Sequence, residues 1–272
     1  MKRTIAILVA ALGALAAVLL WLGAYDISAT DQHLAPTYWM LDTGMRRAVI
    51  QRAKRIEVPP LDDAQKISQG AGHFRAHCAQ CHGAPGIAPE PFALGMLPVP
   101  SNLVHSARTW RAAELYWTVR EGIKMTGMPA WRYRLDDAQL WSIVAFLRVL
   151  PSLSPERYRE MVAAAPAPAP MLRRSTALLV PDAARGRRAI QQYACVTCHV
   201  IPGIVGSNAP VGPPLEGVAT RAFIAGVLPN SGDAMIRWLV SPQTISPGSA
   251  MPDLGVTVQD AADMAAFLAT LD

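Results

Sequence analysis

The stretches "HCAQCH" at residues 77–82 and "ACVTCH" at residues 194–199 hold every cysteine of this 272-residue chain. Both follow one five-residue pattern, Cys-x-x-Cys-His, and the two copies lie more than 100 residues apart. A repeated pattern that uses all four cysteines and sets a histidine at a fixed offset indicates one chemical purpose that occurs twice.

The histidine after each pair of cysteines helps to distinguish between the kinds of site that the motifs could form. Disulfides would use the four cysteines but give no role to His82 and His199. A structural zinc site would need a fourth ligand nearby, and a thioredoxin-like dithiol would lack the adjoining histidine. Covalent attachment of haem uses all six residues, because the two thiols add to the haem vinyl groups and the next residue supplies an imidazole to iron. The sequence predicts two covalently bound haems c, with attachment at Cys78, Cys81, Cys195 and Cys198 and iron ligation by His82 and His199.

The N-terminus carries a membrane signal. Lys2 and Arg3 precede 22 residues without a charge, which end at Tyr25. As a helix this stretch is about 33 Å long, enough to cross the hydrocarbon core of a bilayer. A cleaved secretion signal is the alternative, although its apolar core is usually shorter. In either case the basic residues stay in the cytoplasm and the rest is exported. We expect a bacterial inner-membrane protein with one span and its haem domains on the periplasmic side.

Composition and charge exclude two other classes of protein. Hydrophobic residues make up 51% of the chain and charged residues only 17%, which is not typical of a disordered protein. The net charge is +5, but residues 161–272 hold seven basic and seven acidic residues. No compact basic block appears in that part, so a nucleic-acid partner is not expected.

The chain around each motif predicts a small helical domain that occurs twice. A capped helical pattern precedes each motif, with Asp62 or Asp63 before the first and Asp182 before the second. Each half also ends in a helical pattern, and the first of these has the capping-box spacing Asp136 to Gln139. Alternating alanine and proline between the halves predicts an extended spacer. The predicted organisation is an anchor at 1–25, a juxtamembrane amphipathic segment at 26–60, a first domain at 61–155, a linker at 156–175 and a second domain at 176–272.

Two methionines are the candidates for the second axial ligand of each iron. Met128 and Met251 each precede a proline in a turn-like context, 46 residues after His82 and 52 after His199. Met125, three residues before Met128, remains a competitor in the first half. The remaining methionines of the two halves, such as Met96 and Met235, are better explained as pocket wall or core.

Both halves resemble class I cytochrome c domains, through Cys78–His82 with Met128-Pro129 and Cys195–His199 with Met251-Pro252. The resemblance implies a mainly α fold, an N-terminal transmembrane helix followed by two tandem domains, and a loop carbonyl that orients each ligating histidine. Pro213 of "GPPL" matches that loop position in the second half, and Pro98 or Pro100 is its looser counterpart in the first. The whole chain is similar to bacterial membrane-anchored dihaem cytochromes c.

The segment between the anchor and the first domain predicts a helix of its own. Pro36 suits a first helical turn, and an apolar stripe runs from Tyr38 to Ile56 beside a basic face. One interpretation is a spacer that rests on lipid headgroups, and the other is a docking helix for a membrane-bound partner.

Function follows from the ligand set. Two irons with a histidine and a methionine each have no open position, which favours a relay of single electrons between respiratory components over substrate chemistry. We expect redox partners such as a terminal oxidase, a quinol-oxidising complex or a dehydrogenase, and no small-molecule substrate. A subunit of or donor to a terminal oxidase is the first hypothesis. The electron-exit subunit of a periplasmic dehydrogenase is the alternative, and a dihaem peroxidase is a weaker one.

Overall fold

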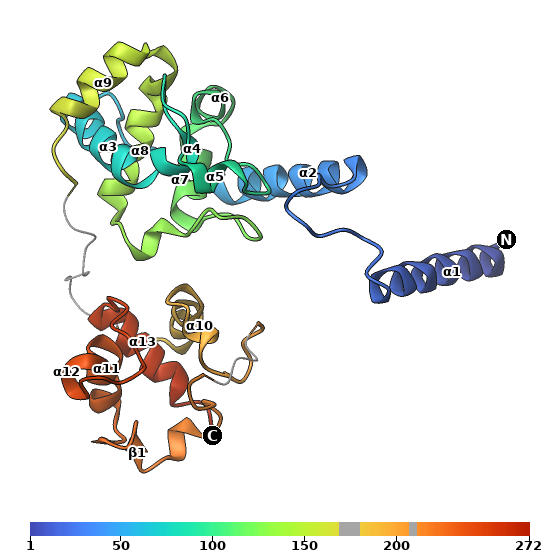
Figure 1. The fold of residues 1–272 in the computed structure, drawn as a ribbon, viewed down its shortest axis with the longest axis vertical. Helices are drawn as coiled ribbons and strands as arrows, with labels where there is room; N and C mark the ends of the chain where they lie inside the picture. Colours follow the sequence, from blue (N-terminus) through green and yellow to red (C-terminus); the bar gives the residue numbers. More distant parts are fainter. Residues whose placement is uncertain (169–179, 207–210) are drawn as a thin grey trace. The chain divides into compact units, whose positions relative to one another are not determined.

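The computed structural model describes residues 1–168, 180–206 and 211–272, and its regular structure is almost entirely helical (Figure 1). The mainly α fold predicted from the sequence is confirmed. In chain order the elements are α1 (Lys2–Trp21), α2 (Ala35–Ala53), α3 (Ala64–His77), α4 (Ala79–His82), α5 (Pro91–Leu94), α6 (Leu103–Thr109), α7 (Ala112–Glu121), η1 (Trp131–Tyr133), α8 (Asp137–Val149), η2 (Leu150–Ser152), α9 (Pro155–Ala164), α10 (Ala183–Gln192), η3 (Cys195–Thr197), η4 (Val218–Thr220), β1 (Phe223–Ile224), β2 (Leu228–Pro229), α11 (Gly232–Val240), α12 (Pro242–Ile245) and α13 (Val258–Leu268). The short strands β1 and β2 pair antiparallel, with Ile224 opposite Leu228.

The chain divides into two compact units. The first comprises residues 1–118, 123–129 and 143–165, and the second comprises 119–122, 130–142 and 166–272. The sequence assigned the two short stretches at 119–122 and 130–142 to the first domain. Both belong to the second unit, and Tyr133 of the stretch 130–142 packs against that unit's apolar core.

A helix, α9, occupies the first part of the segment predicted as linker. Ser154 caps α9 by accepting a hydrogen bond from Arg157 N at 3.2 Å, and Pro155 suits the first helical turn. Arg75 of α3 donates to the carbonyl of Val162 at 2.6 Å, which ties α9 to the first unit. The first unit therefore extends to residue 165. The later part of the predicted linker, from residue 169, lies outside the described residues.

Three aromatic rings from three helices form the centre of the first unit. Phe74 of α3, Phe146 of α8 and Tyr158 of α9 are each at most 1% exposed. The ring centroid of Phe74 lies 5.1 Å from that of Phe146 and 6.2 Å from that of Tyr158, distances typical of favourable aromatic pairs. The expected capping box starts α8, since Asp136 N donates to Gln139 Oε1 at 2.9 Å and Gln139 N donates to Asp136 Oδ1 at 2.8 Å. Because Phe74 is one helical turn before Cys78, this core fixes the helix that leads into the first motif.

The apolar stripe predicted from Tyr38 to Ile56 is only partly buried in helix α2. Only its C-terminal half is packed, with Val49 and Ala53 buried. The guanidinium of Arg46 lies over the ring of Trp110 at 5.5 Å, and that of Arg52 lies over Trp117 at 6.0 Å. Part of the expected basic face therefore holds α2 to the first unit by cation–π contacts instead of facing solvent alone.

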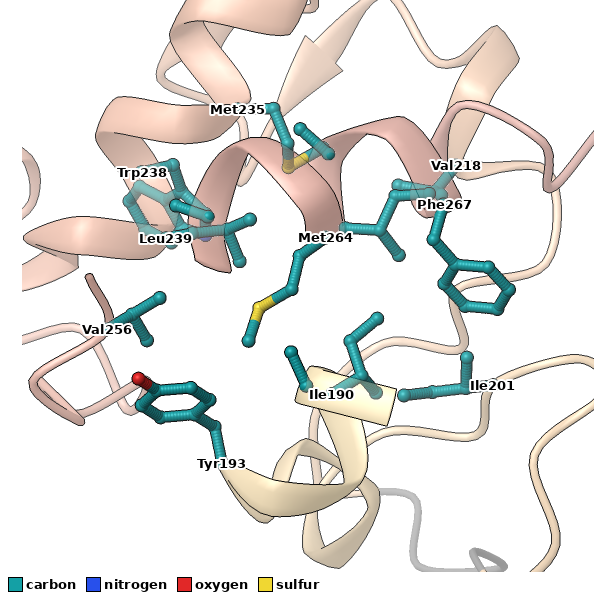
Figure 2. Packing of buried hydrophobic residues seen from close by; sticks show 14 of the residues in the cluster. Ile190, Tyr193, Ile201, Val218, Met235, Trp238, Leu239, Val256, Met264 and Phe267 are labelled. Carbon is teal, nitrogen blue, oxygen red and sulfur yellow. The ribbon is translucent and has the colours of Figure 1, made fainter. Parts of the chain in front are cut away.

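Helices α10 and α13 cross at very close range in the second unit. A Cβ added to Gly186 of α10 would lie 1.9 Å from the carbonyl oxygen of Asp263 in α13. Figure 2 shows Met264 of α13 among Ile190, Tyr193 and side chains of α11, and Met264 is fully buried there. The crossing packs α13 against α10, the helix that ends shortly before the second motif.

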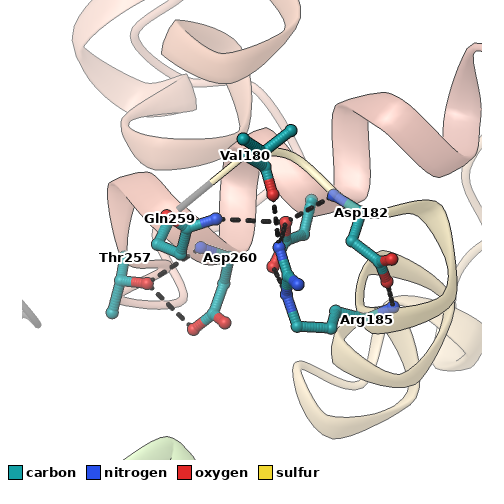
Figure 3. Close-up of polar contacts among 7 residues, drawn as sticks. Val180, Asp182, Arg185, Thr257, Gln259 and Asp260 are labelled. Atoms are coloured by element: carbon teal, nitrogen blue, oxygen red, sulfur yellow. Dashed lines mark hydrogen bonds and ion pairs between the residues drawn. The ribbon is translucent and has the colours of Figure 1, made fainter. Parts of the chain in front are cut away.

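A buried carboxylate locks the same crossing (Figure 3). The side chain of Asp263 is only 2% exposed and accepts two hydrogen bonds from Arg185, at 2.7 Å each. It also accepts from the backbone N of Asp182 at 2.8 Å and from Gln259 at 3.1 Å. Asp182 caps α10 as the sequence predicts, since its side chain accepts from Arg185 N at 2.6 Å. A buried charge with this many donors is satisfied, so it fixes how the two helices meet.

Candidate metal centres

The first motif forms one tight turn at the end of α3. Cys78 N bonds to the carbonyl of Phe74 at 2.9 Å, and His82 N bonds to the carbonyl of Cys78 at 3.0 Å. Gly83 ends the turn with a φ of 63°, a conformation that suits glycine. The turn therefore carries Cys78, Cys81 and His82 on five residues of helix-like backbone, as attachment of one group to all three requires.

A backbone carbonyl holds the first histidine by its Nδ1. That atom lies 2.7 Å from the carbonyl oxygen of Ser101. The sequence analysis placed this role at Pro98 or Pro100, and the structure corrects it to Ser101. The reason is local, because the next residue, Asn102, caps α6 and thereby fixes the peptide whose oxygen accepts the bond. With Nδ1 engaged, Nε2 is the nitrogen that would bind iron.

Burial keeps the first histidine in the form that a metal requires. Burial lowers the pKa of His82, and the hydrogen bond to Ser101 opposes this shift to a smaller extent. A neutral imidazole is the ligand form of histidine, so the environment of His82 suits metal binding.

The second motif forms the same turn in a different unit. Cys198 N bonds to the carbonyl of Cys195 at 3.2 Å, and His199 N bonds to the same carbonyl at 3.0 Å. Tyr193, two residues before Cys195, donates its hydroxyl to the buried carboxylate of Asp260 at 2.8 Å. Burial raises the pKa of Tyr193, and the negative charge of Asp260 raises it further. The hydroxyl therefore stays protonated as a donor and ties the turn to α13.

The second histidine is held by the loop that the resemblance implied. Nδ1 of His199 lies 2.8 Å from the carbonyl oxygen of Pro213. Gly212 N also bonds to the carbonyl of Cys198 at 2.8 Å, so the loop runs directly beside the turn. A Cβ on Gly212 would lie 2.4 Å from Cε1 of His199. The glycine of "GPPL" is therefore a second functional residue of that loop, which the sequence analysis left aside because it considered only the carbonyl.

The state of the cysteines tests the other chemistries of the motifs. All four cysteines lie among the described residues, and none forms a disulfide. Burial raises the pKa of Cys78 to about 12 and that of Cys195 to about 11. A dithiol oxidoreductase needs a lowered pKa that yields a thiolate, so these thiols are unsuited to that role. Within the described ranges no group of three or more His, Cys, Asp or Glu side chains is arranged to hold a metal ion. The two turns fit haem attachment better than a dithiol or zinc site.

The two candidate methionine ligands of the first half differ in how far they are exposed. Met125 is 82% exposed and has a φ of 62°, whereas Met128 is half-buried. Thr126 closes the loop, because its hydroxyl donates to the carbonyl of Ile123 at 2.7 Å and accepts from Met128 N at 3.0 Å. Met96 lies against this loop, since a Cβ on Gly127 would be 3.3 Å from its sulfur. The environment favours Met128 as the ligand and Met96 as part of the pocket wall.

The second methionine loop contains the other candidate. Met251 is half-buried and packs against the apolar core of the second unit, whereas Met235 is part of that core on α11. The side chain of Gln243 bonds to three backbone groups of this loop, at Gly248, Ser249 and Met251. The sequence analysis did not single out Gln243, because no pattern marks a glutamine that bonds to backbone atoms five to eight residues away.

Comparisons with known proteins agree with the division into two halves. Residues 65–147 match the family described as "Cytochrome C oxidase, cbb3-type, subunit III", and residues 183–272 match the family "Cytochrome c". A stretch of 68 residues is 29% identical to cytochrome c oxidase subunit 2 of Alkalihalophilus pseudofirmus. That stretch is 25% of this chain, and it spans 19% of the length of the oxidase subunit.

A solved structure with partial likeness belongs to the reducing HAO-like protein complex of Kuenenia stuttgartiensis. The alignment covers 79% of this chain and 99% of that one, at 17% identity and a TM-score of 0.29. This score is too low to indicate a shared arrangement of the two units.

Proposed function

We propose, from the premise that this chain is a c-type cytochrome with two cytochrome c domains, that it relays single electrons between membrane-associated respiratory proteins. Electron transfer is the function that the two domains indicate. The number of haems, their ligands, the anchorage and the partners below are proposals.

The observation that carries the proposal is the repeated support of the histidine. In each unit a Cys-x-x-Cys-His turn has the Nδ1 of its histidine within 2.8 Å of a loop carbonyl. This contact orients the imidazole and leaves Nε2 for iron. We assign His82 with Met128 to one iron and His199 with Met251 to the other, and Cys78, Cys81, Cys195 and Cys198 to covalent haem attachment.

The residues of each unit would hold the haem and occupy the positions at which a substrate could bind the iron. When bound, haem c supplies an iron that gains and loses one electron. The two cysteines fix the group to its turn, and the loop carbonyl at Ser101 or Pro213 keeps the imidazole in one orientation. Met128 in one unit and Met251 in the other would supply a soft thioether ligand, which favours a high reduction potential and would leave no position for a substrate. This arrangement suits a relay and argues against a peroxidase.

We propose that α1 anchors the protein in a bacterial inner membrane, with both units on the periplasmic side. Helix α1 is 20 residues long, has a mean hydropathy of 2.5 over its most apolar window, and is unburied. Length and composition alone support the span, and a signal sequence has the same properties.

The mature protein should retain residues 1–25 and stay with the membrane after extraction with alkaline carbonate. Intact-mass measurement of the purified protein checks this directly. A chain that starts at residue 26 behind a cleavable secretion signal is the control, and it should leave the membrane. A mature N-terminus near Tyr25 in the natural protein would contradict the anchor while leaving export intact.

We propose a terminal oxidase as the partner, with this chain as its subunit or its donor. The match of residues 65–147 to an oxidase subunit family and the partial likeness to an oxidase subunit 2 support an oxidase over a periplasmic dehydrogenase.

The reduced full-length protein should be re-oxidised by membranes that contain a terminal oxidase, and cyanide should abolish this re-oxidation. Stopped-flow absorbance of the haem bands follows the reaction, and we expect it to be at least about tenfold faster than oxidation by hydrogen peroxide alone. Rapid oxidation by peroxide without membranes would indicate a peroxidase. Reduction by dehydrogenase-containing membranes without cyanide-sensitive re-oxidation would favour the dehydrogenase alternative.

A further inference from the structure

We propose that Gln243 is a positioning residue for Met251, acting as an anchor that keeps the methionine loop closed over the second centre. The inference rests on the proposed role of Met251 as an iron ligand. It adds a residue outside the ligand set that controls how readily this ligand leaves.

The anchor is a set of three hydrogen bonds from one amide. Nε2 of Gln243 donates to the carbonyl oxygens of Ser249 and Met251, at 2.7 Å each. Oε1 accepts from Gly248 N at 3.2 Å. Only this orientation of the amide satisfies both carbonyls, because a carbonyl oxygen accepts from the NH₂ end and not from Oε1. The amide therefore binds the loop backbone from Gly248 to Met251.

Gln243 itself is fixed outside the loop. It lies on α12, next to the buried Pro242, and α12 follows directly after α11, whose Trp238 and Leu239 belong to the core of the unit. The loop has its own internal bonds, from Ser249 N to the carbonyl of Ser246 at 3.1 Å and from Met251 N to Ser249 Oγ at 3.2 Å. Those bonds shape the loop but do not attach it to another element. The amide of Gln243 joins the closing end of the loop, at Met251, to α12, and the bond from Gln243 N to Asp253 Oδ1 at 3.4 Å adds to this link.

The methionine loop of the first unit is closed in a different way from that of the second. In its methionine loop the closing side chain is Thr126, which lies inside the loop and bonds to Ile123 and Met128. A side chain within the loop gives it shape without tying it to a neighbouring element. Opening of the second loop must break the bonds to Gln243, so the anchor lowers the fraction of molecules in which Met251 is away from the iron.

The test measures displacement of Met251 by imidazole in the oxidised, haem-loaded, full-length protein. The signal is the long-wavelength charge-transfer band of a thioether bound to ferric iron, and the part of it that Met251→Ala removes reports the second centre. Gln243→Ala should lower the imidazole concentration at half-displacement by at least about tenfold, since loss of the three hydrogen bonds of the amide raises the open fraction by at least roughly that factor. Gln243→Met, which keeps the length of the side chain and loses the amide, should give the same shift and replaces Gln243→Ala if that variant fails to fold.

A matched control separates positioning from general destabilisation. Gln259→Ala removes a hydrogen-bonded glutamine from α13 of the same unit, where its amide donates to Asp263 Oδ1, and should shift the midpoint less than twofold. Equal shifts for Gln243→Ala and Gln259→Ala, or a midpoint for Gln243→Met within twofold of the natural protein, would overturn the anchor alone. A band unchanged in Met251→Ala would overturn the ligand assignment and the anchor with it.

Discussion

Replacing Met251 with alanine is expected to open the second iron and to lower its reduction potential by on the order of 0.2 V, within the roughly 0.8 V range that axial ligands set. Loss of the thioether removes the ligand that favours the reduced state. The reduced variant should bind carbon monoxide at one haem per chain, and Met128→Ala should do the same at the first haem. A potentiometric titration followed by absorbance, together with a carbon monoxide titration, measures both effects.

Met125→Ala provides the matched control for the first unit. Met125 lies three residues before Met128 but is 82% exposed, so its loss should leave both potentials and carbon monoxide binding unchanged. If Met125→Ala opens the first haem and Met128→Ala does not, the ligand is the other methionine of that loop.

Replacing Gly186 with alanine is expected to destabilise the second unit by at least about 3 kcal/mol, because overpacking against atoms that cannot move is among the most damaging core changes. The added Cβ would lie 1.9 Å from the carbonyl oxygen of Asp263 and 2.8 Å from the backbone N of Met264. Both neighbours are backbone atoms of α13, so no side-chain rotation relieves the overlap. Guanidinium denaturation followed through the methionine–iron band of the second centre measures the loss.

Gly232→Ala makes the same chemical change in the same unit without a close neighbour. No atom lies within 4 Å of a Cβ built at Gly232, at the start of α11. This variant should stay within about 1 kcal/mol of the natural protein, as expected for alanine at a compatible position. Similar losses for the two variants would mean that the α10–α13 crossing is looser than 1.9 Å implies.

The sequence predicted what depends on local pattern. The repeat of Cys-x-x-Cys-His implied two similar domains, and the capping residues Asp63, Asp136 and Asp182 begin their helices as expected. Each of these signals lies within a few residues of the feature that it predicts, so no knowledge of the tertiary structure was needed.

Contacts between distant segments were beyond the sequence. The carbonyl that holds His82 comes from Ser101 and not from a proline, because the cap of α6 decides which peptide of the loop is fixed. Most of helix α9 falls within the segment 156–175 predicted as linker. Its burial against α3, through Tyr158, becomes visible only in the fold. The anchoring role of Gln243 is of the same kind, since it arises from backbone atoms that the sequence does not identify.

The central claim is that each of the two units holds a haem c whose iron is closed by one histidine and one methionine. Near-infrared magnetic circular dichroism of the oxidised full-length protein, normalised to chain concentration, identifies the axial ligands of every haem present. The account predicts two low-spin haems per chain, both with the histidine–methionine signature. A single haem per chain, or one high-spin or bis-histidine haem beside a histidine–methionine haem, would contradict it.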